Sequence, residues 1–169
     1  MKLSNLLIFK GLTETQIEDF ASVCETHRYK AGVDVITKGQ KGNLVYFVIK
    51  GRLQVFRPEA KEDDSHILAE LNSGAVFGEM ELLTEQPRSA SVRALTNVKL
   101  WAISFEAMRE RIDNGNVPTL KIMVNIARIF AHRLEAMDDK LSDIEAGRIE
   151  VHKEALRSFK KKLFSEWDF

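Results

Sequence analysis

The sequence predicts a mainly β fold with flanking helices, and three observations support this prediction. Short β-rich runs fill the chain from Tyr29 to about Ile103, glycines at turn positions separate those runs, and helical patterns lie on either side. Many short strands at regular spacing favour a sandwich or a closed roll over a parallel sheet. We therefore expect one β domain between two helical segments.

Length, charge and composition narrow the class of protein. A chain of 169 residues is long enough for one domain with a core of its own, with or without an appendage. Lys plus Arg and Asp plus Glu number 25 each, so the formal net charge is zero, which argues against a dedicated nucleic-acid binder. The sequence shows neither a signal peptide nor an apolar run of membrane-spanning length, so we expect a cytoplasmic protein without membrane insertion.

The first predicted element is helical and covers residues 3–28. Thr13 is a candidate N-cap because Gln16 follows three residues later, as in a capping box. Helical spacing places four apolar residues on one face, namely Ile17, Phe20, Ala21 and Cys24. Cys24, the single cysteine of the chain, is interpreted as a small buried hydrophobic residue rather than a nucleophile.

The central strands are separated by glycines at turn positions. The runs "NLVYFVIKG" and "RLQVFRP" are typical strands, and "RPEAKEDDSH" predicts a solvated hairpin tip. The glycines that we assign to turns are Gly32, Gly39, Gly42, Gly51, Gly74 and Gly78.

From about Ser104 the pattern becomes helical again, and after a break at "DNGNVPT" Pro118 can open a long helix. Its apolar positions alternate between spacings of three and four, as a heptad seam does. They are Leu120, Met123, Ala127, Phe130, Leu134, Met137, Leu141 and Ile144. We expect this seam to join two copies of the chain in a homodimer; the alternative is that it packs on the chain's own β domain.

The last stretch, "HKEALRSFKKKLFSEWDF", is amphipathic and ends the chain. Leu156, Phe159, Leu163 and Trp167 share roughly one face. The basic run could suggest an anionic membrane surface. From Glu145 onward, however, six basic and five acidic residues leave a net charge of only plus one. We therefore expect this helix to fold back onto its own domain or dimer.

The stretch "FGEMELLTEQPRSASVRA", residues 77–94, carries the chemistry of a candidate anion site. "GEMELL" predicts a short helix, whose first backbone N–H groups lack internal partners and can face an anion. Pro87 stiffens the backbone before Arg88, whose planar guanidinium suits two oxygens of a phosphate or carboxylate. Glu79 adds an acceptor for a sugar hydroxyl. The spacing alone equally allows an internal ion pair between Glu79 and Arg88.

This stretch resembles the phosphate-binding cassette of the cyclic-nucleotide-binding domains, which occur in the catabolite activator protein family, protein kinase A regulatory subunits and cyclic-nucleotide-gated channels. The upstream run "AGVDVITKGQKGNLVYFVIKGRLQVF" is similar to the glycine-marked strands of that family. The resemblance implies an eight-stranded β-roll, of the double-stranded β-helix or jelly-roll type, flanked by helices and holding the nucleotide inside. It further implies two parts: residues 1–118 with the N-terminal helices and the roll, and residues 119–169 with the dimerisation helix and the tail.

The resemblance also assigns roles within the ligand site. It implies that Arg88 binds the cyclic phosphate, that Glu79 binds the ribose 2′-hydroxyl, and that Ser89 contacts the phosphate or a guanine base. The long helix would cover the base near Met137 and Asp138. The full set of ligand-binding residues it implies is Phe77, Gly78, Glu79, Met80, Glu81, Leu82, Arg88, Ser89, Ala90, Met137 and Asp138. The implied ligand is a cyclic nucleotide, cAMP or cGMP, and no cofactor is expected.

Two features depart from the family pattern, one in the cassette and one on the base side. The position of Glu81 is usually a small residue, and a carboxylate ~5 Å from the phosphate would cost roughly 3 kcal/mol, about a hundredfold in affinity. If Glu81 points to water, the cost largely disappears, and the sequence leaves both orientations open. On the base side, Met137 and Asp138 replace the hydroxyls that activator-family members present to adenine, which can change nucleotide selectivity.

The activator family carries a DNA-binding module after the long helix, but only 25 residues follow Ile144 here, so we expect no direct DNA binding. Signalling would instead pass through the dimer helix to an unknown effector protein.

An enzyme is not expected, because the chain lacks a nucleophile elbow and a P-loop. Its histidines are also too scattered for a cupin metal site; they are His27, His66, His132 and His152. The remaining alternative is a dimeric interaction scaffold that keeps the roll but binds no ligand.

Overall fold

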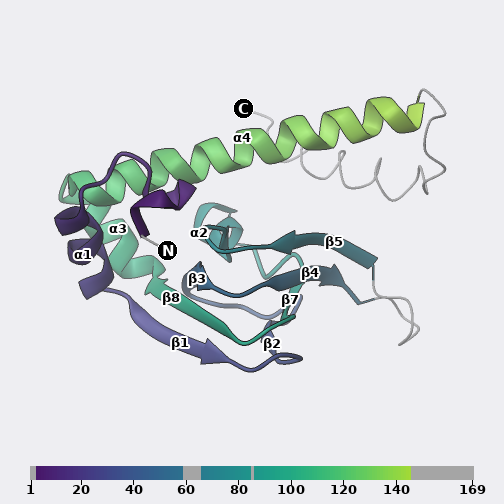
Figure 1. Ribbon diagram of the computed structural model, residues 1–169, viewed down its shortest axis with the longest axis horizontal. Coiled ribbons are helices and arrows are strands. Elements are labelled where there is room, and N and C mark those ends of the chain that lie inside the picture. Colours follow the sequence, from purple (N-terminus) through teal and green to yellow (C-terminus); the bar gives the residue numbers. More distant parts are fainter. Residues whose placement is uncertain (1–2, 59–65, 85, 146–169) are drawn as a thin grey trace. The chain divides into compact units, whose positions relative to one another are not determined.

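The computed structural model describes residues 3–58, 66–84 and 86–145, and it confirms the mainly β fold with flanking helices (Figure 1). The helices are η1 (Leu3–Asn5), η2 (Leu7–Phe9), α1 (Glu14–Ser22), α2 (Glu79–Thr84), α3 (Phe105–Asp113) and α4 (Val117–Glu145). The strands are β1 (Glu25–Tyr29), β2 (Asp34–Ile36), β3 (Leu44–Lys50), β4 (Leu53–Arg57), β5 (His66–Leu71), β6 (Val76–Phe77), β7 (Ser91–Ala94) and β8 (Val98–Ser104).

The eight strands of the described chain form two antiparallel sheets of four, as expected for a β-roll. One sheet has the order β1-β8-β3-β6 and the other β2-β7-β4-β5. Inward-facing residues of both sheets share one apolar cluster, in which Val48 and Leu100 of the first sheet meet Leu53 and Val92 of the second. Each sheet therefore buries one face against the other.

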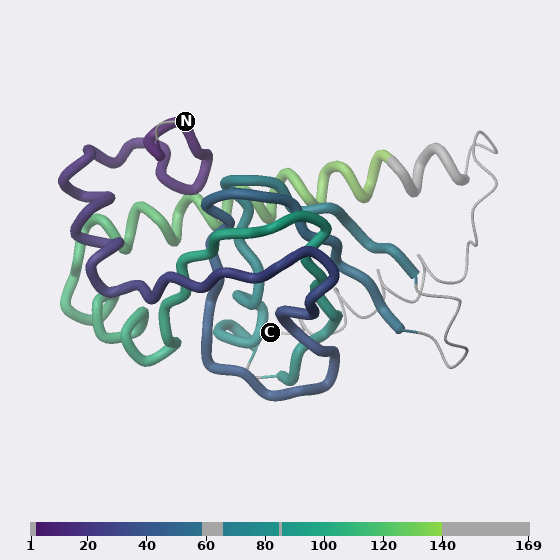
Figure 2. Tube along the Cα trace, turned by 60° about the horizontal axis from the view of Figure 1, so that its bottom comes forward, coloured from purple at the N-terminus to yellow at the C-terminus, as the bar shows by residue number. Residues whose placement is uncertain are grey.

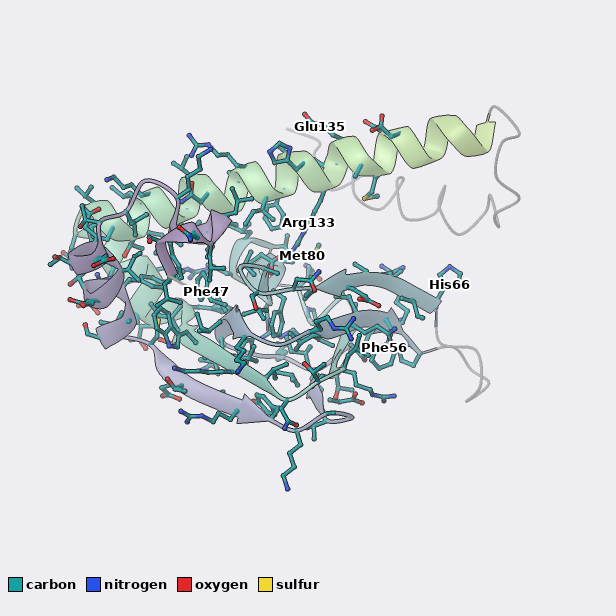
Figure 3. All side chains as sticks on the ribbon, viewed as in Figure 1. Phe47, Phe56, His66, Met80, Arg133 and Glu135 are labelled. Carbon is teal, nitrogen blue, oxygen red and sulfur yellow. The ribbon has the colours of Figure 1, made fainter. Side chains whose placement is uncertain are left out.

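The sheet that contains β3 is also covered on its outer face. Phe47 of β3 meets Phe20 of α1 edge to face, with ring centroids 5.3 Å apart, and Trp101 of β8 packs on Phe9 of η2. Figure 3 shows Phe47 on this helical side of the sheet. Because both faces are covered, β3 is a nearly continuous apolar run, with five consecutive buried residues from Val45 to Ile49.

The N-terminal segment differs from the expected helix over residues 3–28. Thr13 caps α1 through the predicted capping box with Gln16, and Ile17 and Phe20 are buried, but the helix ends at Ser22. Residues Glu25–Tyr29 instead form β1, which pairs along its whole length with β8. The prediction past Ser22 was wrong because pairing with β8 outweighs the local helical spacing.

Hydrogen bonds tie the N-terminal segment to the start of α4. The buried amide of Asn125 donates to the carbonyls of Ile8 and Lys10, at 3.0 and 2.9 Å, and Lys121 donates to the carbonyl of Gly11 at 2.8 Å. Figure 2 shows the purple N-terminal segment beside the green start of this helix. Polar side chains on the first turns of α4 thus satisfy carbonyls that 3-10 turns leave unpaired.

Arg111 connects three helices in the same region. Its guanidinium donates to Thr119 of α4 at 2.9 Å and to Asn116 at 3.0 Å, and it forms an ion pair with Asp19 of α1. Since Arg111 lies on α3, one side chain links α1, α3 and the beginning of α4.

The chain divides into two compact units, Met1–Ile126 and Ala127–Phe169, so α4 begins in the first and continues in the second. The domain boundary that we expect after residue 118 stays a prediction.

The hairpin of β4 and β5 is confirmed, since Arg57 pairs with His66, while most of its tip lies outside the described residues. The amphipathic tail also lies outside them. No described helix is long and apolar enough to cross a membrane.

Candidate functional site

The candidate site is built around the turn between β6 and α2. Gly78 takes a left-handed backbone, with φ of 79°, and reverses the chain between the buried Phe77 and the first residue of α2. A side chain at this position would collide with the guanidinium of Arg88 and with the carbonyl of Leu44. Gly78 is therefore required both for its conformation and for the close approach of Arg88.

Arg88 points into this turn and is only 8% exposed. Its Nη1 donates to the carbonyl of Gly78 at 2.8 Å, and its Nη2 donates to the carbonyl of Leu44 at 2.9 Å. Its backbone is fixed as well, because its N–H donates to Gln40 and its carbonyl accepts from Gly39. These contacts hold the guanidinium in place between α2, β3 and the loop over residues 37–43.

Glu81 faces Arg88 rather than water. The side chain of this α2 residue is 8% exposed, its Oε1 accepts from the backbone N–H of Gly42 at 2.7 Å, and its Oε2 lies 3.0 Å from Nε of Arg88. Oε2 is buried and makes no hydrogen bond within the described residues, so its contact with Arg88 is an ion pair outside hydrogen-bonding geometry. The sequence leaves open whether the side chain of Glu81 points into the site or to water, and in the structure it points into the site.

The other cassette residues divide between buried and exposed. Glu79 and Leu82 are buried at 4% and 7% exposure, whereas Met80, labelled on α2 in Figure 3, is 43% exposed. Ser89 is exposed, with its Oγ 3.7 Å from the sulfur of Met80, and Ala90 is partly buried. The buried hydroxyl of this segment belongs to Ser91, which accepts from the N–H of Lys38.

The structure thus brings Gly78, Glu81 and Arg88 together, with Phe77, Glu79 and Leu82 buried beside them in the chain. Met137 and Asp138 lie on α4 in the second unit, and their contact with a base stays a prediction.

The sequence interpretation missed three main-chain groups that bind Glu81 or Arg88. They are the N–H of Gly42 and the carbonyls of Leu44 and Gln40. Main-chain groups leave no residue-type signal. Gly42 was visible as a glycine, but we interpreted it as a turn residue.

Aromatic rings line the interior of the roll near this site. Tyr46 stacks on Phe77, with ring centroids 5.0 Å apart and an angle of 13°, and His27 meets Tyr46 edge to face. Burial raises the pKa of the Tyr46 hydroxyl, and Tyr29 adds to the increase, whereas the positive charge of Arg88 lowers it. Tyr46 is consequently a neutral hydrogen-bonding group in the electrostatic field of Arg88.

The described part of the chain offers little support for a metal site or for a nucleophilic cysteine. There, no three His, Cys, Asp or Glu side chains lie close enough together to hold a metal ion. Burial raises the pKa of the Cys24 thiol to about 12, despite the opposing effect of Arg111. Because the thiolate is the nucleophilic form, Cys24 is unreactive at neutral pH.

Comparison with known proteins identifies the class that this fold and site define. A family model described as "Cyclic nucleotide-binding domain" matches residues 26–114. The "cAMP-activated global transcriptional regulator CRP" of Salmonella typhimurium is 30% identical over 82% of this chain and 64% of its own length. The "cGMP-dependent protein kinase 2" of Homo sapiens is 34% identical over 59% of this chain and 12% of its own length.

Among solved structures, the catabolite activator protein of Thermus thermophilus superposes with a TM-score of 0.70 and 29% identity. The match covers 82% of this chain and 63% of that one. The protein belongs to the cyclic nucleotide-binding domain family. It spans somewhat less than two thirds of the length of the bacterial regulators that it resembles.

Proposed function

We propose that this chain is a regulatory sensor domain that binds a cyclic nucleotide, with Arg88 holding the cyclic phosphate and Glu79 the ribose 2′-hydroxyl. The observation that carries this proposal is the placement of Arg88. Its guanidinium is buried, fixed by two carbonyls, and directed at the turn that opens the matched cassette. A buried guanidinium of this kind is suited to a ligand with one negative charge.

The cyclic nucleotides that we propose as ligands are cAMP and cGMP. One relative is described as cAMP-activated and is 30% identical over 82% of this chain, and another is described as cGMP-dependent and is 34% identical over 59% of it. The stacked pair of Tyr46 and Phe77 supplies an apolar wall next to Arg88. The residues on α4 that we expect near the base, Met137 and Asp138, would then decide between the two nucleotides.

Signal output in this proposal depends on α4. A ligand that contacted both the roll and α4 would bind one orientation of the helix better than another, and it would shift that equilibrium by its difference in affinity. The heptad seam then presents a changed surface to an effector protein. We propose no catalytic step.

The test is a calorimetric titration of the full chain with cAMP and with cGMP up to millimolar concentrations. We expect binding to the wild-type protein and none to Arg88→Gln, which keeps a polar side chain but loses the charge. Equal binding by the two proteins would reject Arg88 as the phosphate site. No binding of either nucleotide would reject the sensor function.

A second candidate is a dimeric interaction scaffold that needs no ligand. The observation that favours it is the Glu81–Arg88 pair, because a carboxylate of the protein itself already neutralises the guanidinium. Under this function the titration above shows no heat with either protein, and adding cAMP or cGMP leaves the oligomeric state and the melting temperature of the wild-type chain unchanged.

A further inference from the structure

The carboxylate of Glu81 occupies one edge of the guanidinium that the proposed function gives to phosphate. Its Oε2 lies 3.0 Å from Nε of Arg88, and its Oε1 accepts from Gly42. We propose that Glu81 is an internal competitor of the ligand, a built-in anion that lowers the affinity of this site for cyclic nucleotides. This inference rests on the proposed function, because it concerns the same site.

All three nitrogens of the Arg88 guanidinium face oxygen atoms of the protein. Two of the three guanidinium nitrogens donate to main-chain carbonyls, Nη1 to Gly78 and Nη2 to Leu44. The third nitrogen, Nε, faces Glu81. A phosphate that binds in the two-pronged manner through the Nε edge must therefore displace the carboxylate.

The net charge of the Arg88–Glu81 pair also affects ligand binding. Arg88 and Glu81 form a buried pair with no net charge, since both side chains are at most 8% exposed. A cyclic phosphate added beside this pair would leave one uncompensated negative charge in the site. At ~5 Å and an effective dielectric constant of about 20, the repulsion corresponds to about a hundredfold loss of affinity.

The carboxylate of Glu81 has a second contact, with the loop over residues 37–43. Glu81 binds the N–H of Gly42, so the same carboxylate joins α2 to the loop over residues 37–43. Arg88 contacts that loop through its backbone, at Gln40 and Gly39. Glu81 therefore links α2, Arg88 and the loop without any ligand.

A purely structural ion pair is the competing interpretation, and the hydrogen-bond geometry argues against it. A structural carboxylate in a buried site usually has its acceptors satisfied, whereas Oε2 of Glu81 makes no hydrogen bond within the described chain. Withdrawing Oε2 from Arg88 would therefore break an ion pair but no hydrogen bond.

The experiment compares Glu81→Gln with the wild-type protein. Glutamine has nearly the same shape and its Oε1 can still accept from Gly42, while its amide nitrogen, a donor like Nε of Arg88, no longer attracts the guanidinium. We expect cAMP or cGMP to bind Glu81→Gln about a hundredfold more tightly than the wild type. The gain should disappear in the double variant Glu81→Gln with Arg88→Gln.

The outcomes separate this inference from the proposed function. Equal, Arg88-dependent affinities for the wild type and Glu81→Gln would overturn the competitor role and leave the sensor function standing. No binding by either protein would overturn both and favour the ligand-independent scaffold. Tight binding by Glu81→Gln together with weak binding by the wild type would support both.

Discussion

Gly42 stands where the Cβ of any other residue would run into the guanidinium of Arg88. Its φ lies outside the left-handed region that Gly39 and Gly78 adopt, so the backbone at this position does not itself require glycine. The requirement is spatial. A residue without a side chain lets Arg88 lie against the loop and leaves the N–H of Gly42 free to reach Glu81.

We predict that Gly42→Ala lowers the free energy of unfolding by about 1–3 kcal/mol, because the added methyl group forces Arg88 out of its place. Urea unfolding of the full chain measures this loss. Combining the substitution with Arg88→Ala provides the control, since most of the loss should vanish once the guanidinium is absent. An equal loss in both backgrounds would show that Gly42 has some other role.

At the scale of single residues, the sequence placed the charged partners near each other but left the pairing open. Spacing allowed an ion pair of Arg88 with Glu79, whereas the structure pairs Arg88 with Glu81. Both glutamates lie on α2 and both are buried. Which of them reaches the guanidinium depends on how the six-residue helix is rotated against β3, and the residue spacing along the chain does not fix that rotation.

Among the elements, α1 shows which local signals are strong. Its capping box was visible in the sequence because both partners lie within four residues, and the structure contains both hydrogen bonds. The end of α1 was not visible, because β1 is defined by pairing with β8, some 70 residues further along the chain. Local chemistry thus fixed the beginning of the helix, and a distant strand fixed its end.

We predict that Thr13→Ala destabilises the protein by ~1 kcal/mol, since the N–H of Gln16 loses its acceptor. Thermal unfolding followed by circular dichroism should show a melting temperature a few degrees lower. Thr13→Ser retains a hydroxyl cap and should stay close to the wild type. If Thr13→Ser loses as much stability as Thr13→Ala, the cap is not the cause.

The strands and the roll were predictable for a different reason. Short β-rich runs separated by glycines reflect the two-sheet architecture directly, and five of the six glycines assigned to turns do have a left-handed backbone. The sixth is Gly42. Main-chain partners such as the carbonyl of Leu44 carry no side-chain signature, so that part of the site became visible only in three dimensions.

On the scale of the whole molecule, the heptad seam of α4 is the feature that would determine assembly. The helix is continuous from Val117 to Glu145, which confirms the helical period of the seam but leaves its partner a prediction. Within the first unit, the seam residue Leu120 is 39% exposed, and its neighbour Val124 is 51% exposed. Apolar side chains that remain exposed at these positions of α4 are what a second copy of the helix can bury.

We predict a dimer at tens of micromolar protein, and Leu134→Glu should convert it to a monomer by placing a charge in the seam. Sedimentation velocity distinguishes the two species. Ala136→Glu, which adds the same charge outside the seam on the same helix, should remain dimeric. A wild-type protein that sediments as a monomer at these concentrations would refute the heptad interpretation.

The ties between Asn125, Lys121 and the first residues of the chain have a practical consequence. Asn125 lies on a buried face of α4 together with Ile122 and Ile126, and removing residues 3–11 would take away the main-chain partners of this face. The amide of Asn125 would lose two acceptors at the same time. A shortened protein that starts at β1 would thus leave a buried amide of α4 without its hydrogen bonds and lose stability, so crystallisation or spectroscopy of this roll should retain the leading turns.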